Sequence, residues 1–302
     1  MRPVRSLTIF VVVVSVGGGL LAPWSYWLAQ SLSHIFPTLA QNPFHRFVNR
    51  SLLGMALLAL WPFLRSLGVK SVSDVGIVRP TGQWHRLASG FALGFGSLAC
   101  VALIVLALGA SKLNPHLTNL PWGKELLSIT ATAVIVAVLE EVLFRGALFG
   151  ALRKAWHWLF ALLLSSVVYA LVHFLANGKL NGAVDWLSGL ELLPQMLCGF
   201  ADWGEVIPGF FNLTLAGVLL GLAYQRTGNL YFSIGLHAGW IFWLKAYGKL
   251  TTTTVSTGAW FWRTGRLIDG WLALFVFGLL LAMLHRLFRE KKDRSPYDGI
   301  CF

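Results

Sequence analysis

The chain has 302 residues, of which 56% are hydrophobic and only 12% are charged, and its mean hydropathy is +0.68. This composition excludes an ordinary soluble domain and indicates a polytopic membrane protein. The net charge of +12 would suggest a nucleic-acid partner in a soluble protein. In a membrane protein it reflects basic residues in the loops, so no nucleic-acid partner is expected.

Eight apolar stretches predict an all-α fold, a membrane bundle of about eight transmembrane helices. They cover residues 7–28, 52–67, 87–110, 126–152, 156–176, 206–225, 230–247 and 271–288. The first stretch is expected to be an uncleaved anchor rather than a signal peptide, because it is long and lacks a good cleavage site. Gly217 and Gly221 have the small-x-x-x-small spacing that predicts a close contact between helices.

The basic residues predict the orientation in the membrane. When loops are assigned to alternate sides, 14 Lys and Arg residues fall on one side and 9 on the other. The more basic side holds both termini, which the positive-inside rule places in the cytoplasm. An integral multi-pass protein of a bacterial inner (plasma) membrane, with both termini cytoplasmic, is therefore expected.

Three charged residues, Glu140, Glu141 and Arg145, interrupt the apolar stretch 126–152. Even lenient insertion scales assign each such group a cost of roughly 2.5–3.5 kcal/mol at a helix centre. Glu141 and Arg145 are four residues apart and share a helix face, whereas Glu140 is rotated about 100° away. We expect Arg145 to hold Glu141 and leave Glu140 to act in a cavity; the alternative is a structural pair that joins two helices.

Two further predicted helices carry polar residues. Stretch 156–176 and its end hold a polar stripe at helical spacing, and stretch 230–247 holds a serine and a histidine four residues apart. These residues are Ser166, Tyr169, His173, Asn177, Ser233 and His237. Gly235 and Gly239 flank His237 and would allow a neighbouring backbone to approach closely. A lone histidine in a helix is usually a packing residue, but six of the eight histidines lie in loops or at the ends of predicted helices, and only His173 and His237 lie within them.

Two glutamates, two histidines and an arginine inside a bilayer are suited to hydrolysis. A carboxylate can take a proton from water, and imidazoles can donate hydrogen bonds to an oxyanion or bind a metal. The sequence has no His-Glu-x-x-His, and stretch 126–152 has no Gly-x-Ser-x-Gly, which argues against several other hydrolase designs.

Three motifs in order carry a family resemblance. They are Glu140-Glu141-x-x-x-Arg145, Tyr169-x-x-x-His173, and His237-Ala238 in a helix that follows Arg226-Thr227-Gly228-Asn229-Leu230. Together they resemble the CAAX protease and bacteriocin-processing family of intramembrane proteases, which includes Rce1-like prenyl-protein endopeptidases and bacterial Abi proteins. The resemblance covers about residues 125–247.

The resemblance implies a role for each of these residues. Glu140 would activate the attacking water, with Glu141 and Arg145 supporting it. His173 and His237 would bind the oxyanion, and Tyr169 would contact the substrate. No cofactor is then required; the alternative is a divalent metal such as zinc, held by Glu140, His173 and His237. The chain would comprise N-terminal helices in 1–123, a catalytic core in 124–250, and a C-terminal loop, last helix and basic tail in 251–302.

Two positions depart from the family pattern. Tyr169 stands where the second motif usually has Phe, and Ile241 stands four residues after His237, where Asn or Asp is usual. Ser233, Asn229 and Asn212 are candidates for the missing polar group. We therefore expect an endopeptidase that cleaves a membrane-associated protein or peptide. A non-catalytic scaffold or immunity protein of the same fold, and a proton-coupled transporter that uses the same charged residues, are the alternatives.

Overall fold

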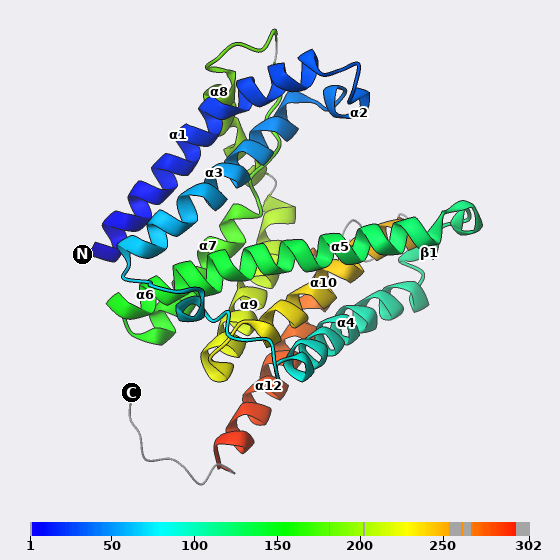
Figure 1. Cartoon of the computed structure of the whole chain (residues 1–302). Coiled ribbons are helices and arrows are strands. Elements are labelled where there is room, and N and C mark those ends of the chain that lie inside the picture. The colour runs from blue at the N-terminus through cyan, green and yellow to red at the C-terminus, as the bar shows by residue number, and fades with distance from the viewer. Residues whose placement is uncertain (1, 181, 202, 254–260, 262–266, 294–302) are drawn as a thin grey trace. The chain divides into compact units, whose positions relative to one another are not determined.

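A computed structural model of the protein describes residues 2–180, 182–201, 203–253, 261 and 267–293. The end of the predicted basic tail at Arg294, and Cys301, lie outside these residues. Helices make up most of the described chain (Figure 1). Two short strands, β1 (Ser111–Leu113) and β2 (Thr251–Thr253), pair in antiparallel fashion with Ser111 opposite Thr253.

Six helical segments of the described chain are long and apolar enough to cross a membrane. They are α1 (Arg2–Ser31), α3 (Phe44–Ser66), α4 (Trp84–Ala107), the continuous run Trp122–Ala155, α9 (Trp203–Thr227) and α12 (Trp271–Asp293). The run Trp122–Ala155 consists of α5 (Trp122–Glu141), η3 (Val142–Phe149) and α6 (Gly150–Ala155). Helices satisfy their backbone hydrogen bonds internally, as an apolar bilayer requires.

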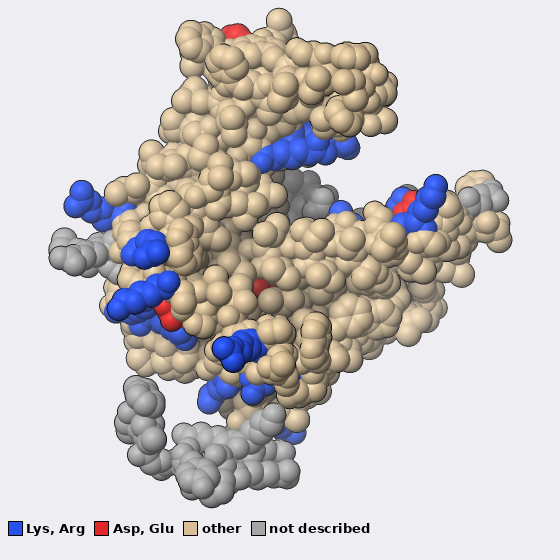
Figure 2. Space-filling view, viewed as in Figure 1, with Lys and Arg blue, Asp and Glu red and all other residues tan. Residues whose placement is uncertain are grey.

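The two remaining predicted stretches are also helical, as α7 (Trp158–Val172) and α10 (Tyr231–Leu250). Each of the eight apolar stretches thus corresponds to a helix, and the all-α fold class is confirmed. Much of the surface seen in Figure 2 carries no charge, and large apolar side chains such as Leu127 on α5 and Leu58 on α3 are exposed. The protein is an integral multi-pass membrane protein, whose exposed apolar helices are suited to contact with lipid.

The short elements connect these helices. They are α2 (Pro37–Ala40), η1 (Val72–Val75), η2 (Leu117–Asn119), α8 (Ser188–Met196) and η4 (Leu197–Phe200). The turn before α8 is fixed by Asp185, whose carboxylate accepts hydrogen bonds from the Ser188 hydroxyl (2.8 Å) and the Leu187 amide (2.9 Å). These bonds favour the ionised form, so the pKa of Asp185 lies below its usual value.

The chain divides into two compact units, each built from several stretches of sequence. The first unit comprises residues 1–71, 150–158 and 171–206, and the second comprises 72–149, 159–170 and 207–302. In the first unit α1 packs on α3, where Gly18 lies against the Leu52 backbone, and α8 packs on α1, where Gly189 lies against Gly19. The three regions expected from the sequence are not tested by this division and stay a prediction.

Helix α7 ends earlier than predicted, and this corrects the expected polar stripe. Val172 is its last residue, so His173 lies in a turn and Asn177 lies beyond any helix. The amide of Ala176 instead donates a 2.7 Å hydrogen bond to the carbonyl of Met196. The Ala176 amide therefore has its partner outside any helix. The spacing of polar residues in the sequence does not reveal such a bond.

Glycines bring the helices of the second unit into close contact. A Cβ at Gly217 or Gly221 of α9 would collide with Ser166 or Leu162 of α7, so the predicted close contact is confirmed. Helices α4 and α10 approach just as closely. A Cβ at Gly94 of α4 would collide with the carbonyl oxygen of Leu236, and one at Gly235 of α10 with that of Leu87.

The start of α5 and the end of α10 are joined to each other. The β1–β2 pairing joins the segment before α5 to the segment after α10, and the Asn114 amide donates to the Leu250 carbonyl (2.9 Å). Glu125 of α5 forms an ion pair with Lys249 of α10 (3.2 Å). The two helices that carry the polar residues are therefore held along their length.

We predict that Gly94→Ala lowers the thermal unfolding midpoint of the purified protein in detergent. The new methyl group would meet the Leu236 carbonyl, and overpacking of this kind costs about 1–3 kcal/mol. Gly96→Ala on the same helix is the matched control, because a Cβ there meets no atom within 4 Å. An equal midpoint for the two variants would contradict the close α4–α10 contact.

Candidate functional site

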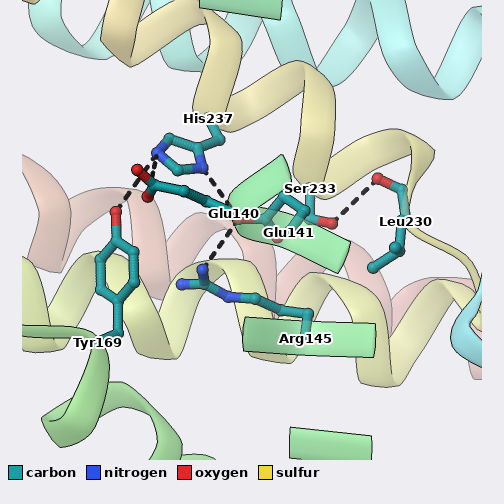
Figure 3. Close-up of polar contacts among 7 residues, drawn as sticks. All are labelled: Glu140, Glu141, Arg145, Tyr169, Leu230, Ser233 and His237. Carbon is teal, nitrogen blue, oxygen red and sulfur yellow. Dashed lines mark hydrogen bonds and ion pairs between the residues drawn. The ribbon is translucent and has the colours of Figure 1, made fainter. Parts of the chain in front are cut away.

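Four elements of the second unit bring the predicted polar residues together (Figure 3). Glu140 and Glu141 are the last two residues of α5, and Arg145 follows in η3. Tyr169 comes from α7 and His237 from α10. All five side chains were singled out in the sequence, and the fold places them next to one another.

Glu141 is at the centre of this cluster. Its side chain is 0% exposed, and its Oε1 lies 3.0 Å from Arg145 Nη1 and 2.9 Å from His237 Nδ1. The predicted Glu141–Arg145 pair is confirmed. A buried carboxylate is tolerated only when charges and hydrogen bonds compensate for the lost water, and here two side chains do so.

Arg145 is also buried, between aromatic rings. Its guanidinium carbon lies 4.4 Å from the centre of the Tyr169 ring and 5.9 Å from that of Phe144. The Phe144 and Tyr169 rings meet edge to face at 5.1 Å. Cation–π contacts of this kind are strongest away from water. Sequence reasoning missed Phe144, although its place between the glutamate pair and Arg145 was a signal.

The partners of His237 define its tautomer. Glu141, paired with Arg145, is a carboxylate that only accepts, so His237 Nδ1 donates to it. In the neutral ring Nε2 then carries no proton, and it accepts from the Tyr169 hydroxyl at 3.3 Å. The same Nε2 lies 3.7 Å from Glu140 Oε2. A neutral His237 therefore has no Nε2 proton to give an oxyanion.

The two glutamates differ in their access to solvent. The side chain of Glu140 is 26% exposed, whereas that of Glu141 is 0% exposed. One carboxylate is thus enclosed by its partners, and the adjacent side chain is partly exposed, although its Oε2, the atom that faces His237 Nε2, is buried. This is the difference expected from the sequence.

The helix changes its geometry directly after Glu141. Residues Val142–Phe149 form a π-helix, in which hydrogen bonds span five residues instead of four. Such segments are rare and occur mostly at functional sites. The sequence indicated only a regular helix here, because a π-segment has no distinct hydropathy pattern.

His173 belongs to the first compact unit and is exposed, one residue beyond the end of α7. Its expected role at the oxyanion therefore stays a prediction. Among the described residues, no group of three or more His, Cys, Asp or Glu side chains could hold a metal ion. The alternative metal site of Glu140, His173 and His237 gains no support from this result.

The three candidates for the polar group missing at Ile241 have other structural roles. Ser233 donates to the Leu230 carbonyl (3.0 Å). Asn229 accepts from the Tyr231 amide (3.2 Å), at the start of α10. Asn212 donates to the carbonyls of Ile268 (2.7 Å) and Gly270 (2.9 Å), just before α12. Ile241 itself is buried in an apolar cluster with Ala133, Ala137 and Ala238.

We predict that Arg145→Met destabilises the protein strongly, because the buried Glu141 would lose its guanidinium partner and keep the imidazole of His237. Breaking a buried pair from one side typically costs about 3–5 kcal/mol. The measurement is the thermal unfolding midpoint, with Arg153→Met, at an exposed position, as the control. The double variant Glu141→Gln/Arg145→Met should lose less stability than the sum of the single changes; additive losses would contradict the coupling.

Comparison with known proteins agrees with this geometry. Residues 122–243 match the family model described as "Type II CAAX prenyl endopeptidase Rce1-like". No curated protein and no solved structure matches the chain. The matched residues contain Glu140, Glu141, Arg145, Tyr169, His173 and His237. Residues 122–243 therefore form an Rce1-like domain of the CAAX protease and bacteriocin-processing family, which is a family of peptidases.

Proposed function

We propose that the protein is an intramembrane endopeptidase that hydrolyses a peptide bond of a membrane-associated protein or peptide. The observation that carries this proposal is the pair of adjacent glutamates: Glu141 is enclosed by Arg145 and His237, whereas Glu140 is partly exposed and its buried Oε2 lies 3.7 Å from His237 Nε2. A general base must reach a water molecule, and its surroundings must hold the charge that develops during the reaction.

In the proposed mechanism Glu140 takes a proton from water, and the resulting hydroxide attacks the scissile carbonyl carbon. The proton would then pass from Glu140 to His237 Nε2, which lies 3.7 Å from Oε2 and must approach it to within hydrogen-bond distance for this transfer. A protonated Nε2 would donate to the oxyanion, and Glu141 would stabilise the imidazolium through Nδ1. When the carbon–nitrogen bond breaks, the same proton passes to the leaving amine.

Tyr169 takes a different role in this mechanism from the substrate contact expected from the sequence. Its hydroxyl reaches His237 Nε2, and its ring covers Arg145. We infer that Tyr169 is a positioning residue, which holds the imidazole with Nε2 directed toward Glu140. His173 is retained as a second oxyanion donor, to be tested by His173→Ala.

The cellular setting remains part of the proposal. The basic residues favour cytoplasmic termini in a bacterial inner membrane. The substrate would then reach the site from the bilayer or its surface.

We predict that Glu140→Gln abolishes cleavage of a quenched peptide library by the purified protein while the unfolding midpoint is retained. Loss of a general base costs about 10²–10⁴-fold in rate. Glu125→Gln is the matched control, since this residue lies on the same helix and pairs with Lys249 outside the site. Equal cleavage by the wild type and Glu140→Gln would refute the proposal. Absence of cleavage in every variant would favour the non-catalytic scaffold.

We predict that Tyr169→Phe lowers kcat about two- to tenfold and leaves KM and stability nearly unchanged. The ring contacts with Arg145 and Phe144 remain, and only the bond to His237 is lost; such a bond contributes about 0.5–1.5 kcal/mol. Tyr247→Phe is the control, because it removes a buried hydroxyl that donates to Ser111 (2.6 Å). The pH–rate profile should shift in Tyr169→Phe alone, which a merely structural role would not produce.

Chelation separates the two mechanisms that the sequence left open. If Glu140 acts as a general base without a metal, cleavage should survive exhaustive treatment with a chelator. Loss of cleavage that is restored by added zinc would instead favour a metal ion on the glutamate and histidine ligands.

A further inference from the structure

The first compact unit has an open groove between α1 and α3, with a volume of about 360 Å³. Its walls are mainly apolar and include Ile9 and Val13 from α1 and Met55 and Leu58 from α3. Because both helices are long and apolar enough to span a membrane, the groove is suited to an acyl chain. It involves none of the residues proposed for catalysis.

One end of the groove is defined by the pairing of the two helices. The rings of Phe10 and Phe63 lie 4.7 Å apart, and further along α1 a Cβ at Gly17 would meet Met55. The helices therefore run antiparallel. Ser6 and Ser66, which both line the groove, lie at the same end.

This end is basic. Arg5 and Arg65 directly precede Ser6 and Ser66, and both are exposed. The Arg65 guanidinium lies 5.2 Å from the centre of the Trp61 ring, which supports the side chain. Lys154 of α6 donates to the carbonyl of Leu67 (3.1 Å) and so brings another positive charge to the end of α3. In Figure 2 several blue groups lie where α1 begins and α6 ends in Figure 1, with a smaller red group beside them near α6.

The stretches that build this end contain no acidic residue, and the nearest one along the chain is Asp74 in η1, three residues after Ser71. Residues 1–71 and 150–158 include no Asp or Glu. The acidic residues of the unit, Asp185, Glu191, Asp202 and Glu205, all come from 171–206, and among them Glu191 lies on α8, which packs against α1 at Gly19. Gly19 is thirteen residues after Ser6, which corresponds to about 20 Å along a helix.

We propose that this groove is a binding site for an anionic phospholipid of the bilayer, with an acyl chain between α1 and α3 and the phosphate at Arg5 and Arg65. The apolar groove alone would accept any lipid, and the exposed positive charges of Arg5 and Arg65 at its end favour an anionic headgroup. The site lies in the unit that does not contain the Glu141–His237 cluster, and it does not depend on the proposed activity.

The test measures thermal unfolding of the full-length protein in detergent as phosphatidylglycerol or phosphatidylcholine with identical acyl chains is added. Phosphatidylglycerol should raise the midpoint at lower concentration and by more than phosphatidylcholine, because binding to the native state stabilises it. The difference should shrink at high salt. Equal stabilisation by the two lipids would overturn the proposal. The same shift with inorganic phosphate alone would show that an acyl chain is not required, and would overturn it as well.

Variants locate the site. Arg5→Gln and Arg65→Gln should each weaken the apparent affinity for phosphatidylglycerol about fivefold, the effect expected for one basic residue near an anionic surface. Ala59→Trp, which fills the groove, should weaken it further. Leu57→Trp is the matched control on the same helix, at an exposed position that does not line the groove. An unchanged preference in Arg5→Gln/Arg65→Gln would place the lipid elsewhere and refute the assignment.

Discussion

The enclosed carboxylate of Glu141 is the constraint on which the second unit depends. A fully buried charge on a helix of a membrane protein is stable only if partners replace its water. Arg145 supplies one partner from the same helical run, and His237 supplies the other from α10. The α5–α10 arrangement is therefore fixed at one point by charge and hydrogen bonding. The glycines of α10 then let α4 pack close behind it.

This constraint also gives two neighbouring glutamates different chemistry. Glu141 is surrounded by a guanidinium and an imidazole, while Glu140, one residue earlier, keeps 26% of its side chain exposed. In many enzymes, two identical titratable groups act as acid and base, or in other separate roles, because their surroundings differ. The rotation of about 100° between successive helical residues is enough to create this difference. The change to a π-helix after Glu141 alters the direction of the residues that follow, among them Arg145.

The sequence predicted what depends on hydropathy and helical spacing. The eight helices, the Glu141–Arg145 pair and the Gly217 and Gly221 contacts follow from those two properties. It did not predict the end of α7 at Val172, because a backbone bond to the distant Met196 engages the chain after that helix. Nor did it predict that the Tyr169 hydroxyl contacts His237, because these residues come from helices far apart in the sequence, α7 and α10. Hydropathy and spacing within one segment do not indicate contacts with residues that are distant in the sequence.

The position four residues after His237 illustrates how packing and chemistry compete for one helix face. Ile241 follows His237 by about one turn, and Ala137 precedes Glu141 by the same spacing. The polar contact between Glu141 and His237 is thus continued by an apolar contact of Ile241 with Ala133 and Ala137. A polar side chain at 241 would interrupt that contact. The Tyr169 hydroxyl approaches His237 from α7 instead, so a polar partner for Nε2 is provided without disturbing the α5–α10 packing.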